Sequence, residues 1–236
     1  LSIVIPFTDS DPFLNDTFNL YKIQNPNKNN LEKNILNKKY KEYHNIFKDN
    51  FIILLANTFM SMNIFDNVFR IPFNDKMFIE KSKIKKINNT LFKDKINKIV
   101  WRGDTTGGKT KSLRNNVVNY LRNNIFCDVK FVEKNKNRLT TEKMSEYKGI
   151  LVIDGKAMSS SLSWVFTSNS VPLIISVWKT YFDDFFIPWE DYIPIKIDLS
   201  DIQEKINFVL NEKNNDICQN IIESGFNKFK KFSSRE

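Results

Sequence analysis

Short apolar runs alternate with longer amphipathic segments along most of this chain. Several apolar runs are continuous, a pattern typical of strands that are buried on both faces of a parallel sheet. We expect strands at Leu1–Phe7, Phe51–Leu55, Ile99–Trp101, Cys127–Val132, Ile150–Ile153, Val171–Val177 and Ile193–Ile197. We expect helices at Leu31–Phe47, Ile79–Phe92, Ser112–Asn123, Thr140–Glu146, Ser159–Ser168 and Asp201–Leu210.

Strands that alternate with helices of this length indicate βαβ units and a parallel α/β sheet. The alternation becomes regular after Lys98, so we expect a boundary near residue 95 and two domains, residues 1–95 and 96–236. No apolar run approaches the roughly 20 residues of a membrane span, so we expect a soluble chain without one. The chain begins with Leu1 rather than Met, which indicates a fragment. A targeting segment could precede it, so cytoplasmic and secretory locations both stay open.

The formal net charge is +9, which raises the question of nucleic-acid binding. The lysines are spread through Asn/Lys-rich connections and form no dense run interleaved with aromatic residues, so we expect no nucleic-acid partner. Cys127 and Cys218 are too few for a disulfide framework and lack the spacing of a metal site. His44 is the only histidine and lies in a polar helical stretch, which disfavours a Ser-His-Asp hydrolase and a histidine-rich metal site.

One candidate motif is a phosphate-binding loop. Gly103–Thr110 has the spacing G-x-x-x-x-G-K-T and lies between an expected strand and an expected helix. Ile150–Asp154 is an apolar strand that ends in Asp, like the magnesium-positioning strand of nucleotide hydrolases. An NTPase or kinase that uses Gly103–Thr110 and Asp154 is therefore one interpretation. It leaves the pattern after Asp154 unexplained.

A longer ordered pattern includes both of these segments. Its members are Trp101-Arg102-Gly103, Thr105-Thr106-Gly107, Asp154-Gly155, Ser159, Ser168-Asn169-Ser170, Pro188-Trp189, Tyr192, Pro194 and Asp198-Leu199-Ser200-Asp201. The pattern resembles glycosyltransferase family 90, which includes protein O-glucosyltransferases, fungal capsule xylosyltransferases and bacterial surface-glycan enzymes. The resemblance covers residues 95–230 well and residues 1–95 weakly.

The resemblance implies a GT-B-like α/β fold of two Rossmann-like lobes with parallel sheets. The N-terminal lobe, residues 1–95, would be short or truncated and would face the acceptor, and residues 96–236 would bind the nucleotide-sugar. The implied reaction moves a sugar, glucose or xylose, from a UDP-sugar to a hydroxyl of a glycan or protein, with inversion. The resemblance implies no metal and no cofactor beyond the donor.

The expected donor site consists of two turns whose backbone N–H groups, hydroxyls and cations suit a diphosphate. Its residues are Arg102, Gly103, Thr105, Thr106, Gly107, Lys109, Arg114, Asp154, Gly155, Ser159, Ser160 and Ser161. Ser161 stands where the family carries an arginine. Arg102, Lys109 or Arg114 could replace that charge; otherwise the chain would be a weak or non-catalytic relative.

An inverting transfer needs a carboxylate to deprotonate the acceptor hydroxyl. The family has an Asp just after an N-terminal strand, and Asp9 follows Ile3–Thr8 in a similar pattern, with Asp11 as the alternate. Two other interpretations of these residues stay open. They could be turn residues before Pro12, or Asp9-Ser10-Asp11 could be the D-x-D motif of metal-dependent glycosyltransferases.

Overall fold

The computed structural model describes residues 2–7, 51–56, 68–72, 79–80, 84–105, 113–134, 136–155, 159–176, 183, 185–232 and 234–235. The chain divides into two compact units. The first consists of Leu1–Asp75 with Val177–Phe182, and the second of Lys76–Ser176 with Asp183–Glu236. Residues 76–95 thus group with the second unit. The assignment of acceptor and donor lobes to residues 1–95 and 96–236 stays a prediction.

The N-terminal unit contains a three-stranded parallel sheet in the order β1-β2-β3. Its strands are β1 (Ser2–Phe7), β2 (Phe51–Ala56) and β3 (Val68–Pro72). In the register, Ile3 lies opposite Ile52 and Ile53 lies opposite Phe69. The strands expected at Leu1–Phe7 and Phe51–Leu55 are confirmed.

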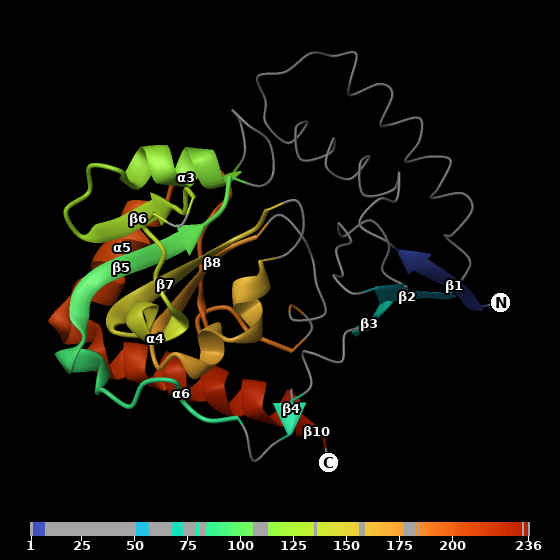
Figure 1. The fold of residues 1–236 in the computed structure, drawn as a ribbon. Helices are drawn as coiled ribbons and strands as arrows, with labels where there is room; N and C mark the ends of the chain where they lie inside the picture. The colour runs from blue at the N-terminus through green and yellow to red at the C-terminus, as the bar shows by residue number, and fades with distance from the viewer. Residues whose placement is uncertain are drawn as a thin grey trace, which may run out of the picture. The chain divides into compact units, whose positions relative to one another are not determined.

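The C-terminal unit is built on a five-stranded parallel sheet in the order β6-β5-β7-β8-β9 (Figure 1). The strands are β5 (Ile96–Gly103), β6 (Cys127–Phe131), β7 (Tyr147–Ile153), β8 (Val171–Ile175) and β9 (Ile193–Pro194). The chain runs from β5 to one neighbour, β6, and then crosses to the other, β7. In doubly wound sheets such a reversal leaves a crevice at the carboxyl ends of the two strands. The expected α/β class with parallel sheets is confirmed.

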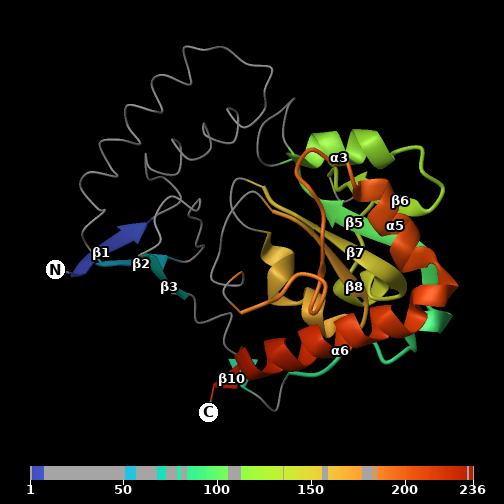
Figure 2. The same ribbon diagram turned by 180° about the vertical axis from the view of Figure 1, so that it is seen from behind.

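The strands of this sheet are connected through helices and 3₁₀ turns. The α-helices are α3 (Leu113–Leu121), α4 (Thr141–Met144), α5 (Ile202–Leu210) and α6 (Asn215–Phe232). Of these, α5 packs on β5 and β7, α3 on β6, and α6 on β8 (Figure 2). No helix in the described part of the chain is long and apolar enough to cross a membrane.

The core is centred on β7, in which residues 150–153 are at most 1% exposed. This continuous apolar run is buried on both faces, as expected for a central parallel strand. Gly149 precedes the run, and a Cβ there would lie 2.5 Å from Ile99 Cδ1 and 2.7 Å from Leu173 Cδ1. Any larger residue at this position would require the ends of these two side chains to shift.

The helix predicted over Ile79–Phe92 is wrong in the described residues. Ile79–Glu80 forms a short strand, β4, which pairs with β10 (Ser234–Arg235). Residues 84–91 contain no helix, and a single 3₁₀ turn, η3 (Phe92–Asp94), follows. The segment is fixed by tertiary contacts, because Ile84 and Phe92 are buried and the Ile87 N–H donates to Thr167 O at 2.7 Å. Tertiary packing here overrides the helical periodicity.

A buried lysine, Lys95, fastens the amino ends of three strands. Its ammonium donates to Ser145 O before β7, and to Ser168 O (3.2 Å) and Ser170 Oγ (3.1 Å) before β8. Lys95 is 5% exposed. Burial, with a smaller contribution from Lys86, lowers the pKa of Lys95 from 10.5 to about 8. The Ser168-Asn169-Ser170 segment therefore has a structural role: it supplies hydrogen-bond acceptors to Lys95 at the amino edge of the sheet.

We expect Lys95 to make the protein more stable as the pH rises from about 8 to about 10.5. In that window the unfolded chain keeps the proton that the folded protein has lost, so the free energy of unfolding increases with pH. The gain should be about 1–3 kcal/mol. Urea unfolding at pH 7.5 and 9.5 measures it, and Lys95→Met is the control that lacks the group. Parallel pH dependence in both proteins would contradict the expectation.

Candidate functional site

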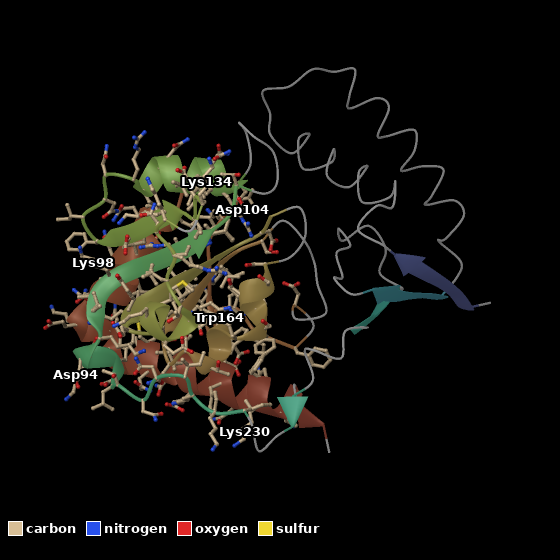
Figure 3. All side chains as sticks on the ribbon, viewed as in Figure 1. Asp94, Lys98, Asp104, Lys134, Trp164 and Lys230 are labelled. Atoms are coloured by element: carbon tan, nitrogen blue, oxygen red, sulfur yellow. The ribbon has the colours of Figure 1, made fainter. Side chains whose placement is uncertain are left out.

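The two turns expected to form the donor site lie at the same edge of the C-terminal sheet. Gly103 is the last residue of β5, and Asp154 and Gly155 directly follow β7. Because β5 and β7 are adjacent parallel strands, both turns lie at their carboxyl ends, where the strand order reverses. Figure 3 labels Asp104 at this end of β5.

Arg114, in the first turn of α3, links the ends of the two strands. Its Nη1 donates to Asp104 O at 3.1 Å, while Nε and Nη2 donate to Ile153 O at 3.2 and 3.0 Å. The guanidinium lies 5.7 Å from the centre of the Trp101 ring. Burial lowers the pKa of Arg114, and the Asp154 and Asp104 carboxylates oppose that shift. The guanidinium stays charged at neutral pH, so the crevice carries a fixed positive group.

Asp154 organises the other side of the crevice. It is 3% exposed, and its Oδ1 accepts from the Ser159 N–H at 3.0 Å. Its Oδ2 accepts from Ser176 Oγ at 2.6 Å. The carboxylate thereby joins the end of β7, the turn after it and the end of β8. Because both oxygens accept bonds within the chain, this arrangement differs from that of a carboxylate that faces an open magnesium site.

The helix predicted over Ser159–Ser168 is wrong. Two short 3₁₀ helices replace it, η4 (Ser160–Ser163) and η5 (Val165–Thr167). Side chains in this segment bond back to its own backbone, such as Ser163 Oγ to Ser160 O at 2.7 Å and Thr167 Oγ1 to Trp164 O at 2.6 Å. Such bonds compete with the α-helical pattern. The segment therefore lacks the long helix dipole on which the expected phosphate cradle depended.

The three expected cradle serines differ in accessibility. Ser159 is 3% exposed and caps η4, accepting a bond from the Ser161 N–H at 3.4 Å. Ser160 is exposed and Ser161 is half-buried. Ser160 and Ser161 thus present polar groups near the crevice, whereas the Ser159 side chain serves the turn.

Arg102 points away from this crevice and pairs with β6. Its Nη2 lies 2.7 Å from Asp128 Oδ2, and its side chain is 6% exposed. Burial would raise the pKa of Asp128, but hydrogen bonds from Arg102, Lys130 and Tyr147 lower it to about 2. Contact between Arg102 and a donor stays a prediction.

Several expected site residues lie outside the described residues, namely Asp9, Asp11, Thr106, Gly107 and Lys109. Among the side chains that the structure does describe, no three His, Cys, Asp or Glu residues form a group that could hold a metal ion. The expectation of a metal-free site stays a prediction, because the Asp9-Ser10-Asp11 segment is not among those side chains.

The sequence pattern did not predict two residues that make key contacts: Ser176, which bonds Asp154, and Asp128, which pairs with Arg102. Ser176 immediately follows β8, but the predicted strand Val171–Val177 ran through it. A polar residue directly after an apolar strand was the available signal, since sites in parallel sheets lie at such positions. For Asp128, the available signal was a carboxylate at a partly buried position of the strand β6.

Two carboxylates in the C-terminal part of the chain, Asp191 and Asp201, form hydrogen bonds within the chain. Asp191 is fully buried and accepts bonds from the Ile187 N–H at 2.6 Å, from Ser224 Oγ at 2.7 Å and from Lys228. Asp201 precedes α5 without capping it, and its Oδ1 accepts from the Lys196 N–H at 2.9 Å. These contacts favour packing roles for Asp191 and Asp201.

Trp189 and Tyr192 flank Asp191 at the start of β9. Trp189 has a positive φ of 68° and packs edge-on against Phe208, while Lys205 Nζ lies 4.5 Å from its ring centre. Burial raises the pKa of Tyr192 to about 12, and the nearby Asp183 and Asp191 carboxylates add to the shift. Tyr192 therefore stays protonated at neutral pH.

A family model described as glycosyl transferase family 90 matches residues 76–232. Uncharacterized protein 179R of Invertebrate iridescent virus 6 is 31% identical over 106 residues, which cover 42% of this chain and 9% of that protein. Protein O-glucosyltransferase 1 of Homo sapiens is 35% identical over 81 residues, covering 34% of this chain and 20% of that protein. The chain therefore corresponds to a small part of the length of these relatives.

Among solved structures, a crystal structure of an α1,3-fucosyltransferase is similar to this chain. The alignment covers 80% of this chain and 75% of the fucosyltransferase chain. The TM-score is 0.41 and the sequence identity is 13%.

Proposed function

Because this chain belongs to glycosyl transferase family 90, we propose that it binds a UDP-sugar at the carboxyl ends of β5 and β7. It transfers the sugar to a hydroxyl of a glycan or protein acceptor, with inversion and without a metal. Glucose and xylose are the candidate sugars. The similarity to protein O-glucosyltransferase 1 supports glucose.

The observation that carries the proposal is that two turns of the family pattern lie together at the carboxyl ends of β5 and β7, where the strand order reverses. The matched turns at Gly103–Thr105 and Asp154–Gly155 meet there, and Arg114 bridges them through Asp104 O and Ile153 O. A diphosphate favours a fixed cation at the positive end of a helix dipole, here the start of α3. Arg114 is therefore our candidate for the charge that Ser161 does not supply.

In the proposed reaction, Asp9 accepts the proton of the acceptor hydroxyl. The hydroxyl oxygen forms a bond to the anomeric carbon as the bond from that carbon to the β-phosphate oxygen breaks. UDP leaves with the bonding electrons, and its added negative charge is compensated by Arg114, Lys109 and backbone N–H groups. Attack opposite the leaving group inverts the anomeric carbon.

The phosphate-loop interpretation has one observation in its favour. The Gly103–Thr110 pattern does lie between a strand, β5, and a helix, α3. Both oxygens of Asp154 are bonded to Ser159 and Ser176, which argues against a magnesium-positioning role. The family match spans both segments, so we favour the glycosyltransferase.

A thermal-shift comparison tests the donor class. The ligands are UDP, UDP-glucose, UDP-xylose, ADP and ATP, each measured with magnesium and with EDTA. A ligand that binds only the folded protein raises the melting temperature, and the shift grows with the logarithm of the ratio of ligand concentration to Kd. We expect UDP and a UDP-sugar to stabilise the protein equally with and without EDTA. Stabilisation by ATP and magnesium alone would support the phosphate-loop interpretation instead.

A further inference from the structure

We propose that Arg102 is a positioning residue that fastens the connection between β6 and α4, residues 132–140, beside the carboxyl end of β5. It affects the donor only through this connection. The inference rests on the proposed function, because it concerns one wall of the proposed donor site. It differs from the expectation that Arg102 contacts the diphosphate.

The guanidinium of Arg102 is already bonded within the chain. Its Nε donates to Asn137 O at 2.7 Å, and its Nη1 to Trp101 O at 2.9 Å and to Asp128 O at 2.6 Å. Its Nη2 donates to Asp128 Oδ2 at 2.7 Å. These bonds use four of the five N–H groups of the side chain. Little of the guanidinium is left for a ligand.

The direction of the side chain supports the same conclusion. In the register of β5 and β6, Asp128 lies opposite Val100, whereas Arg102 lies opposite Lys130. The Arg102 side chain therefore reaches back along the sheet, toward the amino ends of the strands. A ligand at the carboxyl edge would lie on its other side.

Other side chains hold the Asp128 carboxylate in position to bond the Arg102 guanidinium. Lys130 Nζ lies 2.9 Å from Asp128 Oδ1, and Tyr147 OH donates to Oδ2 at 3.1 Å. The carboxylate is thus fixed by side chains of three successive strands, β5, β6 and β7. It stays ionised at neutral pH and balances the charge of Arg102.

The connection is tied to β5 at two points. The Val132 N–H donates to Gly103 O at 2.9 Å, and Asn137 O accepts from Arg102 Nε. Between them, Glu133 and Lys136 exchange backbone hydrogen bonds of 3.3 and 2.6 Å. Lys134 and Asn137 have positive φ values of 40° and 62°. Removing one anchor should let this constrained backbone relax.

The connection carries three exposed basic side chains. Lys134, Lys136 and Arg138 are all exposed. Figure 3 labels Lys134 and Asp104 at this edge of the unit. Fastened next to Gly103, these cations raise the local positive potential for an anionic nucleotide-sugar. A loosened connection should weaken donor binding without slowing the chemical step.

Asp128→Asn separates positioning from direct contact. If Arg102 positions the connection, Asp128→Asn and Arg102→Gln should each raise the KM for UDP-glucose by about three- to tenfold with kcat unchanged. The double variant should be no worse than either single variant, because both break one interaction. If Arg102 contacts the donor directly, Asp128→Asn should leave the KM unchanged or lower it. That result would overturn the inference.

A second measurement does not depend on activity. Trypsin cuts after Lys134, Lys136 and Arg138, so mass spectrometry of a brief digest reports how well the connection is held. We expect cleavage there to be about fivefold faster in Asp128→Asn and Arg102→Gln. Asp216→Asn, at an exposed carboxylate on α6, is the matched control. Unchanged cleavage in the folded Asp128→Asn protein would also overturn the inference.

These readouts separate the inference from the proposed function. If the unmodified protein does not bind UDP-glucose, the proposed function fails, while the digest still tests whether Arg102 holds the connection. If Arg102→Gln does not fold, Arg102→Lys keeps the charge but loses the forked geometry that bonds Asp128 and Asn137 together.

Discussion

Replacing Asp9 by Asn is expected to lower kcat by about 10²- to 10⁴-fold while the affinity for the UDP-sugar stays the same. Asparagine keeps the size of the side chain but cannot accept the proton of the acceptor hydroxyl. The proton must then pass to water, and the transition state loses the stabilisation that the base provides. Initial rates of UDP formation measure kcat, and calorimetric titration with UDP measures the affinity.

Asp11→Asn is the matched control for this prediction, because Asp11 is the alternate base two residues away. Loss of turnover in Asp11→Asn alone would move the role of the base to that residue. Full turnover in both variants would remove the base from this segment. Loss of UDP binding in Asp9→Asn would indicate a structural or metal-binding role instead.

Replacing Arg114 by Met is expected to weaken UDP-sugar binding by about 10- to 100-fold, which corresponds to about 1.4–2.8 kcal/mol. The guanidinium bonds Asp104 O and Ile153 O, so its loss loosens the two turns of the crevice. It also removes the cation that we assign to the diphosphate. A charge-assisted bond of this kind is worth about 1.5–3 kcal/mol. Calorimetric titration with UDP measures the change.

Arg122→Met is the control for Arg114, because Arg122 is an exposed arginine just after α3 and should leave binding unchanged. Arg114→Lys should recover part of the affinity by restoring the charge without the fork. Equal UDP affinity in Arg114→Met and the unmodified protein would show that the donor is not held at this crevice.

The sequence was informative where apolar runs were continuous. The run at Ile150–Ile153 predicted a central strand because it is long enough for a strand and apolar on both faces. The turn residues after β5 and β7 were also predictable, since polar residues that directly follow such strands share one edge of the sheet. The order of the strands could not be predicted, because the sequence of β5 does not determine which two strands pair with it.

Two helix predictions failed for different physical reasons. Ser159–Ser168 and Ile79–Phe92 both have helical periodicity, but hydroxyl bonds to the backbone reshape the first and tertiary contacts fix the second. Arg102 illustrates a different limit. Its neighbours in sequence suggest a phosphate contact, whereas its partner, Asp128, lies 26 residues further along the chain. Such pairings depend on strand register, which a single sequence does not reveal.

The measurement that tests the central claim most directly is UDP formation from UDP-glucose and UDP-xylose in the presence of EDTA. Acceptors that carry free hydroxyls, both glycans and peptides, are supplied in turn, and the Asp9→Asn protein serves as the blank. We predict acceptor-dependent UDP formation at least about 100-fold above the blank. UDP-sugar binding without any turnover above the blank would contradict the account and identify the chain as a non-catalytic member of its family.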